Sequence, residues 1–184
     1  MRKIPPELEN PVDRVFIDMA DASSEFYKSL NFTPNMLTTL SLITGLISFV
    51  LFIEGYNILA AIFYLISYYY DTCDGFFARK YKMESEFGDI YDHVVDWTKN
   101  FLLIYALYVR SKTKFISSVI ILGVFALLSA VHLGCQEQYY TSDVSQPLMD
   151  NLAQLCPIPT YINITKYFGT GTFTLVFAII MLTY

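Results

Sequence analysis

The sequence predicts an all-α protein, a polytopic bundle of transmembrane helices with an amphipathic surface helix at its N-terminal end. The uncharged apolar stretches 36–53 and 115–133 are each long enough to cross a bilayer. Only 16% of the residues are charged, against about 25% in soluble domains, and the mean hydropathy is +0.42. We expect residues 1–35 to form a tail and an interfacial helix, and residues 36–184 to form the transmembrane domain.

The N-terminal part predicts a surface helix rather than a cleavable signal peptide. Residues 1–11 are polar and rich in proline, and they lack the apolar core of a signal peptide. In residues 12–30, apolar side chains recur near helical spacing: Val12, Val15, Phe16, Met19, Phe26 and Leu30. The pattern favours a helix along the membrane surface, and packing of this helix on the bundle is the alternative. Pro34 lies in the break that follows.

Five apolar segments predict five spanning helices. They are residues 36–53, 58–80, 88–109, 115–133 and 167–184. Short turns separate the first two segments and the third from the fourth. Residues 134–166 contain three prolines and are expected to form a loop with a short surface helix.

The distribution of Lys and Arg predicts the orientation of the bundle. One end of the expected helices carries Arg2, Lys3, Arg14, Lys28, Arg79, Lys80, Lys82 and Lys166. The opposite end carries Arg110, Lys112 and Lys114, and Lys99 falls within the third helix. The excess predicts that the first end faces the cytoplasm, which makes the chain an integral, multi-pass membrane protein.

Charge and cysteine content exclude some classes of function. The net charge is −5, so the chain shows no basic footprint for nucleic acid. The three cysteines have no metal-binding spacing. Cys73 and Cys135 are expected to be buried apolar fillers.

Four carboxylates stand at helical spacing beside apolar segments. Asp71 and Asp74 are three residues apart, and Asp92 and Asp96 are four apart, so each pair lies on one face of its helix. A carboxylate at membrane depth costs about 3 kcal/mol on insertion scales. Hard divalent cations are the natural partners of such oxygen ligands, and two of them would neutralise four carboxylates.

The stretch 71–96 resembles the signature of the CDP-alcohol phosphotransferase (CDP-alcohol phosphatidyltransferase) family. The signature reads D-x-x-D-G-x-x-A-R, eight residues, G-x-x-x-D-x-x-x-D, and this chain has all eight defined residues. A looser resemblance runs from Thr33 to about Gln138. The family typically has six spans. The five apparent here leave three alternatives open: a missing sixth helix, a truncated chain, or a weakly marked span within residues 144–162.

The resemblance implies roles for individual residues. As metal ligands it implies Asp71, Asp74, Asp92 and Asp96, holding two Mg²⁺ or Mn²⁺ ions. As residues near the CDP-linked donor it implies Asn35, Thr38, Gly75, Ala78, Arg79 and Ser85. A planar guanidinium suits phosphate oxygens, and glycine permits close approach to the helix backbone.

Two residues are candidates for the general base. Asp96 is the base that the resemblance implies for the family in general. His93 follows Asp92 directly, and an Asp-His pair at this place is usual in the choline and ethanolamine branch. Histidine can accept a proton near neutral pH. A role as a hydrogen-bonding neighbour of the metal site is the alternative for His93.

The expected function is therefore a membrane phosphotransferase of phospholipid synthesis that releases CMP. The main reading is transfer from CDP-choline or CDP-ethanolamine to diacylglycerol. The alternative is a CDP-diacylglycerol donor with a small polyol or amino-alcohol acceptor. A divalent-cation transporter is a third reading, which the phosphate-binding chemistry of Arg79 disfavours.

The expected partners are the CDP-linked donor, a lipid or alcohol acceptor and membrane lipids, with a homodimer left open. A purely structural network of aspartates is disfavoured because only Lys99 and His93 are nearby to offset their charge.

Overall fold

The computed structural model describes residues 2–138, 152–156 and 158–184, and every regular element in these ranges is helical. The α-helices are α1 (Pro11–Ser29), α2 (Pro34–Ile53), α3 (Asn57–Tyr81), α4 (Glu86–Arg110), α5 (Lys112–Glu137), α7 (Ile162–Thr165) and α8 (Thr170–Leu182). Short 3-10 turns are η1 (Ala153–Leu155), η2 (Pro159–Tyr161) and η3 (Lys166–Phe168). The all-α prediction is confirmed.

Side-chain caps fix where the long helices begin. The Thr33 hydroxyl accepts a hydrogen bond from the Met36 amide in the first turn of α2. Pro34 lies at the first helical position, where a backbone N–H would have no partner within the helix. The Ser85 hydroxyl caps α4, and the Ser111 hydroxyl caps α5. These caps start both helices two or three residues before the positions 88 and 115 that the apolar segments predict.

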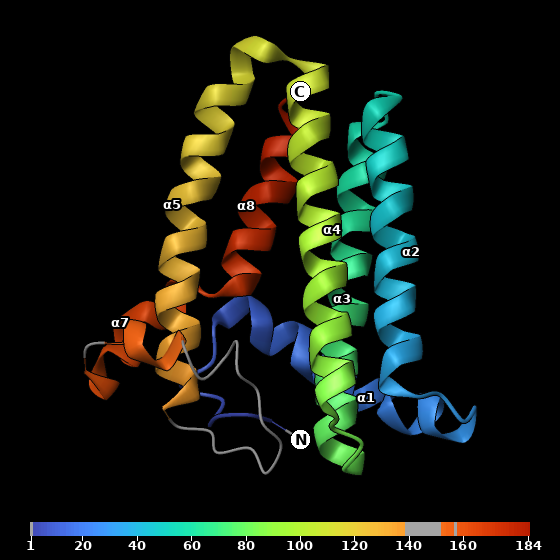
Figure 1. Ribbon diagram of the computed structural model, residues 1–184, viewed down its shortest axis with the longest axis vertical. Helices are drawn as coiled ribbons and strands as arrows, with labels where there is room; N and C mark the ends of the chain where they lie inside the picture. The colour runs from blue at the N-terminus through green and yellow to red at the C-terminus, as the bar shows by residue number, and fades with distance from the viewer. Residues whose placement is uncertain (1, 139–151, 157) are drawn as a thin grey trace.

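The long helices stand side by side, and α1 runs across one end of the bundle (Figure 1). Buried side chains from α2, α3, α4, α5 and α8 form the main core, which includes Phe52, Tyr64, Leu103, Leu107, Leu122, Phe177 and Met181. Its centre lies toward the end of the bundle away from α1 (Figure 1). Polar residues line a cavity at the other end of the bundle, near α1.

Small residues bring α2 and α3 into close contact. The Ser67 hydroxyl donates to the carbonyl of Ser41 at 2.7 Å, and the Ser48 hydroxyl donates to the carbonyl of Ala60 at 2.8 Å. Small hydroxylated side chains allow helices to approach closely in a membrane. The motif face of α3 is thereby held at a fixed distance from α2.

The N-terminal helix both packs on the bundle and exposes apolar side chains. Ala20 and Ser24 are buried, whereas Val15, Met19, Phe26 and Leu30 are exposed. At Gly171, an added Cβ would come within 2.1 Å of Asp13, so α8 meets α1 in close contact. One face of this helix therefore packs on the bundle, and the position of its exposed face along the membrane surface stays a prediction.

Among the described residues, three helical segments are long and apolar enough to cross a membrane: Pro34–Ile53, Lys112–Glu137 and Ile162–Leu182. Helices α3 and α4 have 25 residues each, about 37 Å of helix, but they carry the charges of the motif. Both lie beside α2 (Figure 1). The chain is a helical membrane protein, and the crossing of the membrane by α3 and α4 stays a prediction.

One prediction about the cysteines is confirmed and one is wrong. Cys73 is a buried free thiol, whereas Cys135 forms a disulfide with Cys156. The pairing depends on how residues 152–156 fold back on α5: at Gly134 an added Cβ would lie 2.1 Å from the carbonyl of Leu152. Residues 139–151 and 157 of the predicted loop lie outside the described residues, and so do residues 144–151 and 157 of the suggested hidden span.

Candidate metal and nucleotide site

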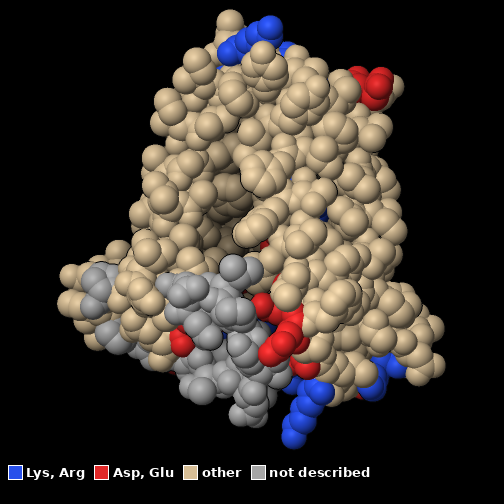
Figure 2. Space-filling view, viewed as in Figure 1, with Lys and Arg blue, Asp and Glu red and all other residues tan. Residues whose placement is uncertain are grey.

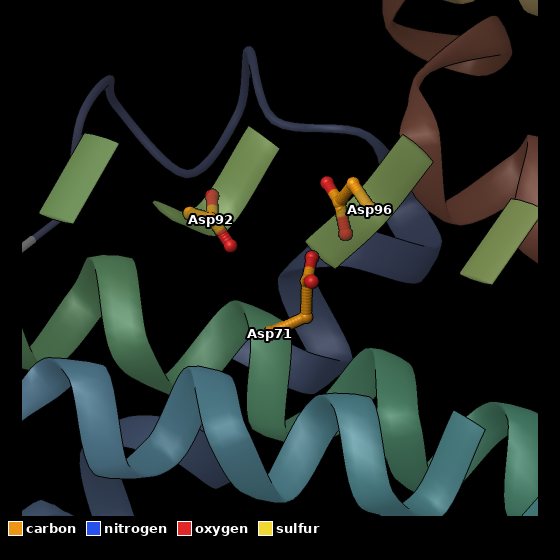
Figure 3. A group of neighbouring side chains, drawn as sticks. All are labelled: Asp71, Asp92 and Asp96. Carbon is orange, nitrogen blue, oxygen red and sulfur yellow. The ribbon is translucent and has the colours of Figure 1, made fainter. Parts of the chain in front are cut away.

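Three aspartates from two helices point toward one another. Asp71 comes from α3, and Asp92 and Asp96 come from α4 (Figure 3). One carboxylate oxygen of each lies within 4.8 Å of the others. The helical spacing of Asp92 and Asp96 places both on one face of α4, and this face is turned toward Asp71 of α3 (Figure 3).

The fourth aspartate of the motif lies at the same site with a different partner. Asp74 is 4% exposed and accepts a hydrogen bond of 2.5 Å from the Thr38 hydroxyl of α2. It lines the same cavity as the other three aspartates. Thr38 thus anchors one carboxylate of the motif to the preceding helix.

The donor set fits a hard divalent cation. Carboxylate oxygens converge from two helices, and the site offers no soft ligand among its closest side chains within the described residues. The buried Oδ1 atom of Asp92 has no hydrogen-bond partner among the described residues. A buried ionised oxygen without a partner is costly, and a bound cation would satisfy it.

Lys99 also contacts this cluster. Its Nζ lies 2.8 Å from Asp71 Oδ1 and 2.9 Å from Asp96 Oδ1, and it donates to the Ser41 hydroxyl at 2.6 Å. Lys99 compensates one negative charge out of four.

A cavity of about 270 Å³ adjoins the aspartates, and every candidate site residue contributes to its lining. Its lining includes Asn35, Thr38, Asp71, Asp74, Gly75, Ala78, Arg79, Ser85, Asp92, His93 and Asp96. Residues that are up to 61 positions apart in the sequence, from Asn35 to Asp96, thus share one cavity. Ser85 also has a structural role there, since its hydroxyl accepts a hydrogen bond from the Gly88 amide at 3.0 Å.

Two glycines leave room for polar groups in this cavity. At Gly75 an added Cβ would lie 3.2 Å from a guanidinium nitrogen of Arg79. At Gly88 it would lie 3.0 Å from the Ser85 hydroxyl and 3.3 Å from Asn35 Oδ1. A side chain at either position would press on groups that the cavity presents.

The geometry of His93 determines which of its nitrogens can accept a proton. Nδ1 lies 2.7 Å from the backbone carbonyl of Asp89, one turn earlier in α4. A carbonyl only accepts, so Nδ1 carries the proton and the lone pair of neutral His93 is on Nε2.

A second cavity of about 640 Å³ extends from the aspartates between the helices. It is shared by α3, α4, α5 and α8, and its apolar lining includes Trp97, Ile104, Ala126, Ala130, Leu133 and Phe173. Figure 2 shows a hollow between α5 and α4, with acidic side chains near its lower edge. The sequence did not indicate this apolar part, because its residues belong to no motif.

The N-terminal segment closes part of this second cavity. Arg2, Lys3 and Asp13 line it. Asp13 is 7% exposed and accepts hydrogen bonds from the hydroxyls of Tyr68 and Thr170. Burial raises the pKa of the Asp13 carboxyl to about 6.

Known proteins resemble the chain over most of its length. The model of the family described as CDP-alcohol phosphatidyltransferase matches residues 31–184. An uncharacterized protein of Aquifex aeolicus is 33% identical over 57% of this chain and 54% of its own length. No solved structure matches significantly.

Two further relatives have names that state an activity. A CDP-diacylglycerol–inositol 3-phosphatidyltransferase of Candida albicans is 27% identical over 79% of this chain and 71% of its own length. An archaetidylinositol phosphate synthase of Pyrococcus horikoshii is 33% identical over 52% of this chain and 47% of its own length. The chain thus spans about half the length of two of the three relatives.

Proposed function

Because the chain belongs to the CDP-alcohol phosphatidyltransferase family, we propose that it is a membrane transferase of phospholipid synthesis. It moves a substituted phosphate from a CDP-linked donor to an alcohol hydroxyl and releases CMP. The observation that carries the proposal is the convergence of the aspartates, Gly75 and Arg79 on one cavity. These are the groups needed to hold a nucleotide diphosphate beside divalent ions.

We further propose that the donor is CDP-diacylglycerol or a similar CDP-linked lipid and that the acceptor is a small polyol. Both named relatives carry inositol in their names, and the Candida protein is named for a CDP-diacylglycerol donor. The apolar cavity beside the aspartates supports a lipid-linked substrate. The comparisons favour this alternative over the choline or ethanolamine reading that His93 suggested.

Each group of the cavity has a chemical task in this proposal. The metal ligands would be Asp71, Asp74, Asp92 and Asp96. Mg²⁺ or Mn²⁺ ions held there would neutralise the charge of the diphosphate and of the departing CMP. Arg79 binds phosphate oxygens through its planar fork. Small or polar side chains surround the nucleotide: Asn35, Thr38, Gly75, Ala78 and Ser85.

The acceptor hydroxyl must lose its proton, and two side chains can take it. Asp96 lies in the carboxylate cluster itself, and His93 presents Nε2 from the preceding turn of α4.

The interpretation as a divalent-cation transporter gains no support, since Arg79 and Lys99 place fixed positive charges along the cavities. We propose that the cavity end of the bundle faces the cytoplasm, as the excess of Lys and Arg predicts.

The test is CMP release by the purified chain in lipid nanodiscs with Mg²⁺. CDP-diacylglycerol is supplied with inositol, inositol phosphate, glycerol phosphate or serine, and CDP-choline is supplied with diacylglycerol. We expect CMP only from CDP-diacylglycerol with a polyol or its phosphate. Release only from CDP-choline would restore the first reading, and no release from any pair, with wild type folded, would contradict the transferase proposal.

A further inference from the structure

Lys99 is held in place along its whole side chain. It is 6% exposed, although it lies in the middle of α4. Its ammonium contacts Asp71 of α3, Asp96 of its own helix and the Ser41 hydroxyl of α2. A buried ammonium with three oxygen partners on three helices has little freedom to move away.

The stem of Lys99 passes through a gap that a glycine leaves open. At Gly45 of α2 an added Cβ would lie 2.9 Å from both Cγ and Cδ of Lys99 and 3.2 Å from the Ser67 hydroxyl. These are closer than ordinary van der Waals contacts, so a side chain at this position would displace the lysine. The packing of α4 on α2 at Gly45 thus fixes where the charge of Lys99 lies.

We propose that Lys99 is a positioning residue of the metal centre, which holds Asp71 and Asp96 and weakens the centre's affinity for divalent ions. This inference rests on the proposed metal site. The ammonium binds one oxygen of each carboxylate and leaves the other for a metal ion. It also repels any cation that approaches the same pair.

A weaker centre has a functional consequence. Four uncompensated carboxylates in a partly buried site would bind divalent ions tightly and would repel one another whenever an ion leaves. With Lys99 present, the ions can exchange while Asp71 and Asp96 stay in place. Neither the signature nor the comparisons assign this role, because Lys99 lies three residues beyond the last aspartate of the motif.

The first test is Mn²⁺ binding to Lys99→Met in detergent, measured by calorimetry and by electron paramagnetic resonance. Methionine retains much of the stem volume but removes the charge. We expect Mn²⁺ to bind at least tenfold more tightly than to wild type, and the melting temperature in the presence of a chelator to fall by several degrees. Unchanged or weaker Mn²⁺ binding by the folded variant would overturn the proposal.

A second variant covers the case in which Lys99→Met does not fold. Gly45→Ala keeps the lysine but displaces its stem, so we expect Mn²⁺ affinity to change by at least threefold. Gly123→Ala is the matched control, because an added Cβ there meets nothing within 4 Å. Equal Mn²⁺ affinity in Gly45→Ala, Gly123→Ala and wild type would overturn the proposed role of Lys99 but not the metal site. Wild type that binds no Mn²⁺ at all would instead overturn the metal site on which it rests.

Discussion

At the residue scale, the shape of a side chain matters as much as its charge. Arg79 and Gly75 illustrate this, since a guanidinium nitrogen lies 3.2 Å from the position a Cβ on Gly75 would take. A lysine would carry the same charge but would offer no planar fork to two phosphate oxygens. The signature therefore combines glycine and arginine at adjacent turns of α3.

Replacing Arg79 by lysine should weaken donor binding without unfolding the protein. We expect the KM for the CDP-linked donor to rise by about tenfold, equal to about 1.4 kcal/mol, because one charge-assisted hydrogen bond is lost. Steady-state CMP release at varied donor concentration measures it. An unchanged KM in a variant with wild-type melting temperature would mean that Arg79 does not bind phosphate.

The two candidate bases can be separated by comparing turnover with metal affinity. Asp96→Asn should reduce both, because it removes a carboxylate of the cluster. If His93 is the base, His93→Ala should lower turnover by about 10²–10⁴-fold at saturating Mg²⁺ and leave Mn²⁺ affinity unchanged. A His93→Ala enzyme that retains most of its turnover would assign the proton transfer to Asp96.

Residues of the motif could be predicted from the sequence, whereas their neighbours could not. The spacing of Asp71, Asp92 and Asp96 is enough to align them on facing helices. The contacts of Lys99 depend on a gap at Gly45, which lies 54 residues earlier and belongs to no pattern. Such a contact requires the register of α2 against α3 and α4 to be known.

At the element scale, α1 connects the N-terminal segment to the last helix. Asn10 caps α1 and donates through Nδ2 to the Lys166 carbonyl and to the Thr172 hydroxyl. Asp13 is buried against Thr170 and Tyr68 in the same contact. Two polar residues of one helix thus hold three parts of the chain together.

The buried carboxyl of Asp13 should make this contact depend on pH. Its pKa is about 6 in the folded protein against an ordinary value of 3.8, so between these values the folded state binds more protons than the unfolded state. The free energy of unfolding should therefore fall as pH rises from about 4 to 6, by at most about 3 kcal/mol.

Asp13→Asn should remove this dependence, because asparagine still accepts a hydrogen bond from Tyr68 but does not titrate. The melting temperature of the variant relative to wild type should rise between pH 4.5 and pH 7.5. Asp21→Asn, on the exposed face of the same helix, is the control and should show no such rise. A constant difference between Asp13→Asn and wild type across this range would contradict the account.

Helix boundaries show which elements a hydropathy pattern can predict. The cap residues Ser85 and Ser111 extend α4 and α5 by a turn or less beyond their apolar segments. The disulfide between Cys135 and Cys156 was missed because it joins the end of α5 to a turn that has no periodic pattern. Its formation depends on the close approach at Gly134, which only the tertiary structure shows.

At the scale of the whole molecule, the two cavities meet at the aspartates. The smaller is lined by polar residues of the motif. The larger combines the aspartates and charged residues of the N-terminal segment with apolar residues of α4, α5 and α8. On the face that Figure 2 shows, charged groups lie mostly in the lower part and at the top, and the middle is largely uncharged. This arrangement suits a reaction between a water-soluble acceptor and a donor that stays in the membrane.

The proposed transfer from a CDP-linked lipid depends on divalent ions held by the aspartates of α3 and α4. The most direct measurement is CMP release from CDP-diacylglycerol and a polyol by wild type in nanodiscs, first with Mg²⁺, then with a chelator, then with Mg²⁺ restored. We expect CMP release to stop on chelation and to return when Mg²⁺ is restored. We also expect Asp92→Asn to lower the rate of CMP release by at least 10²-fold. Full CMP release in the presence of the chelator would contradict it.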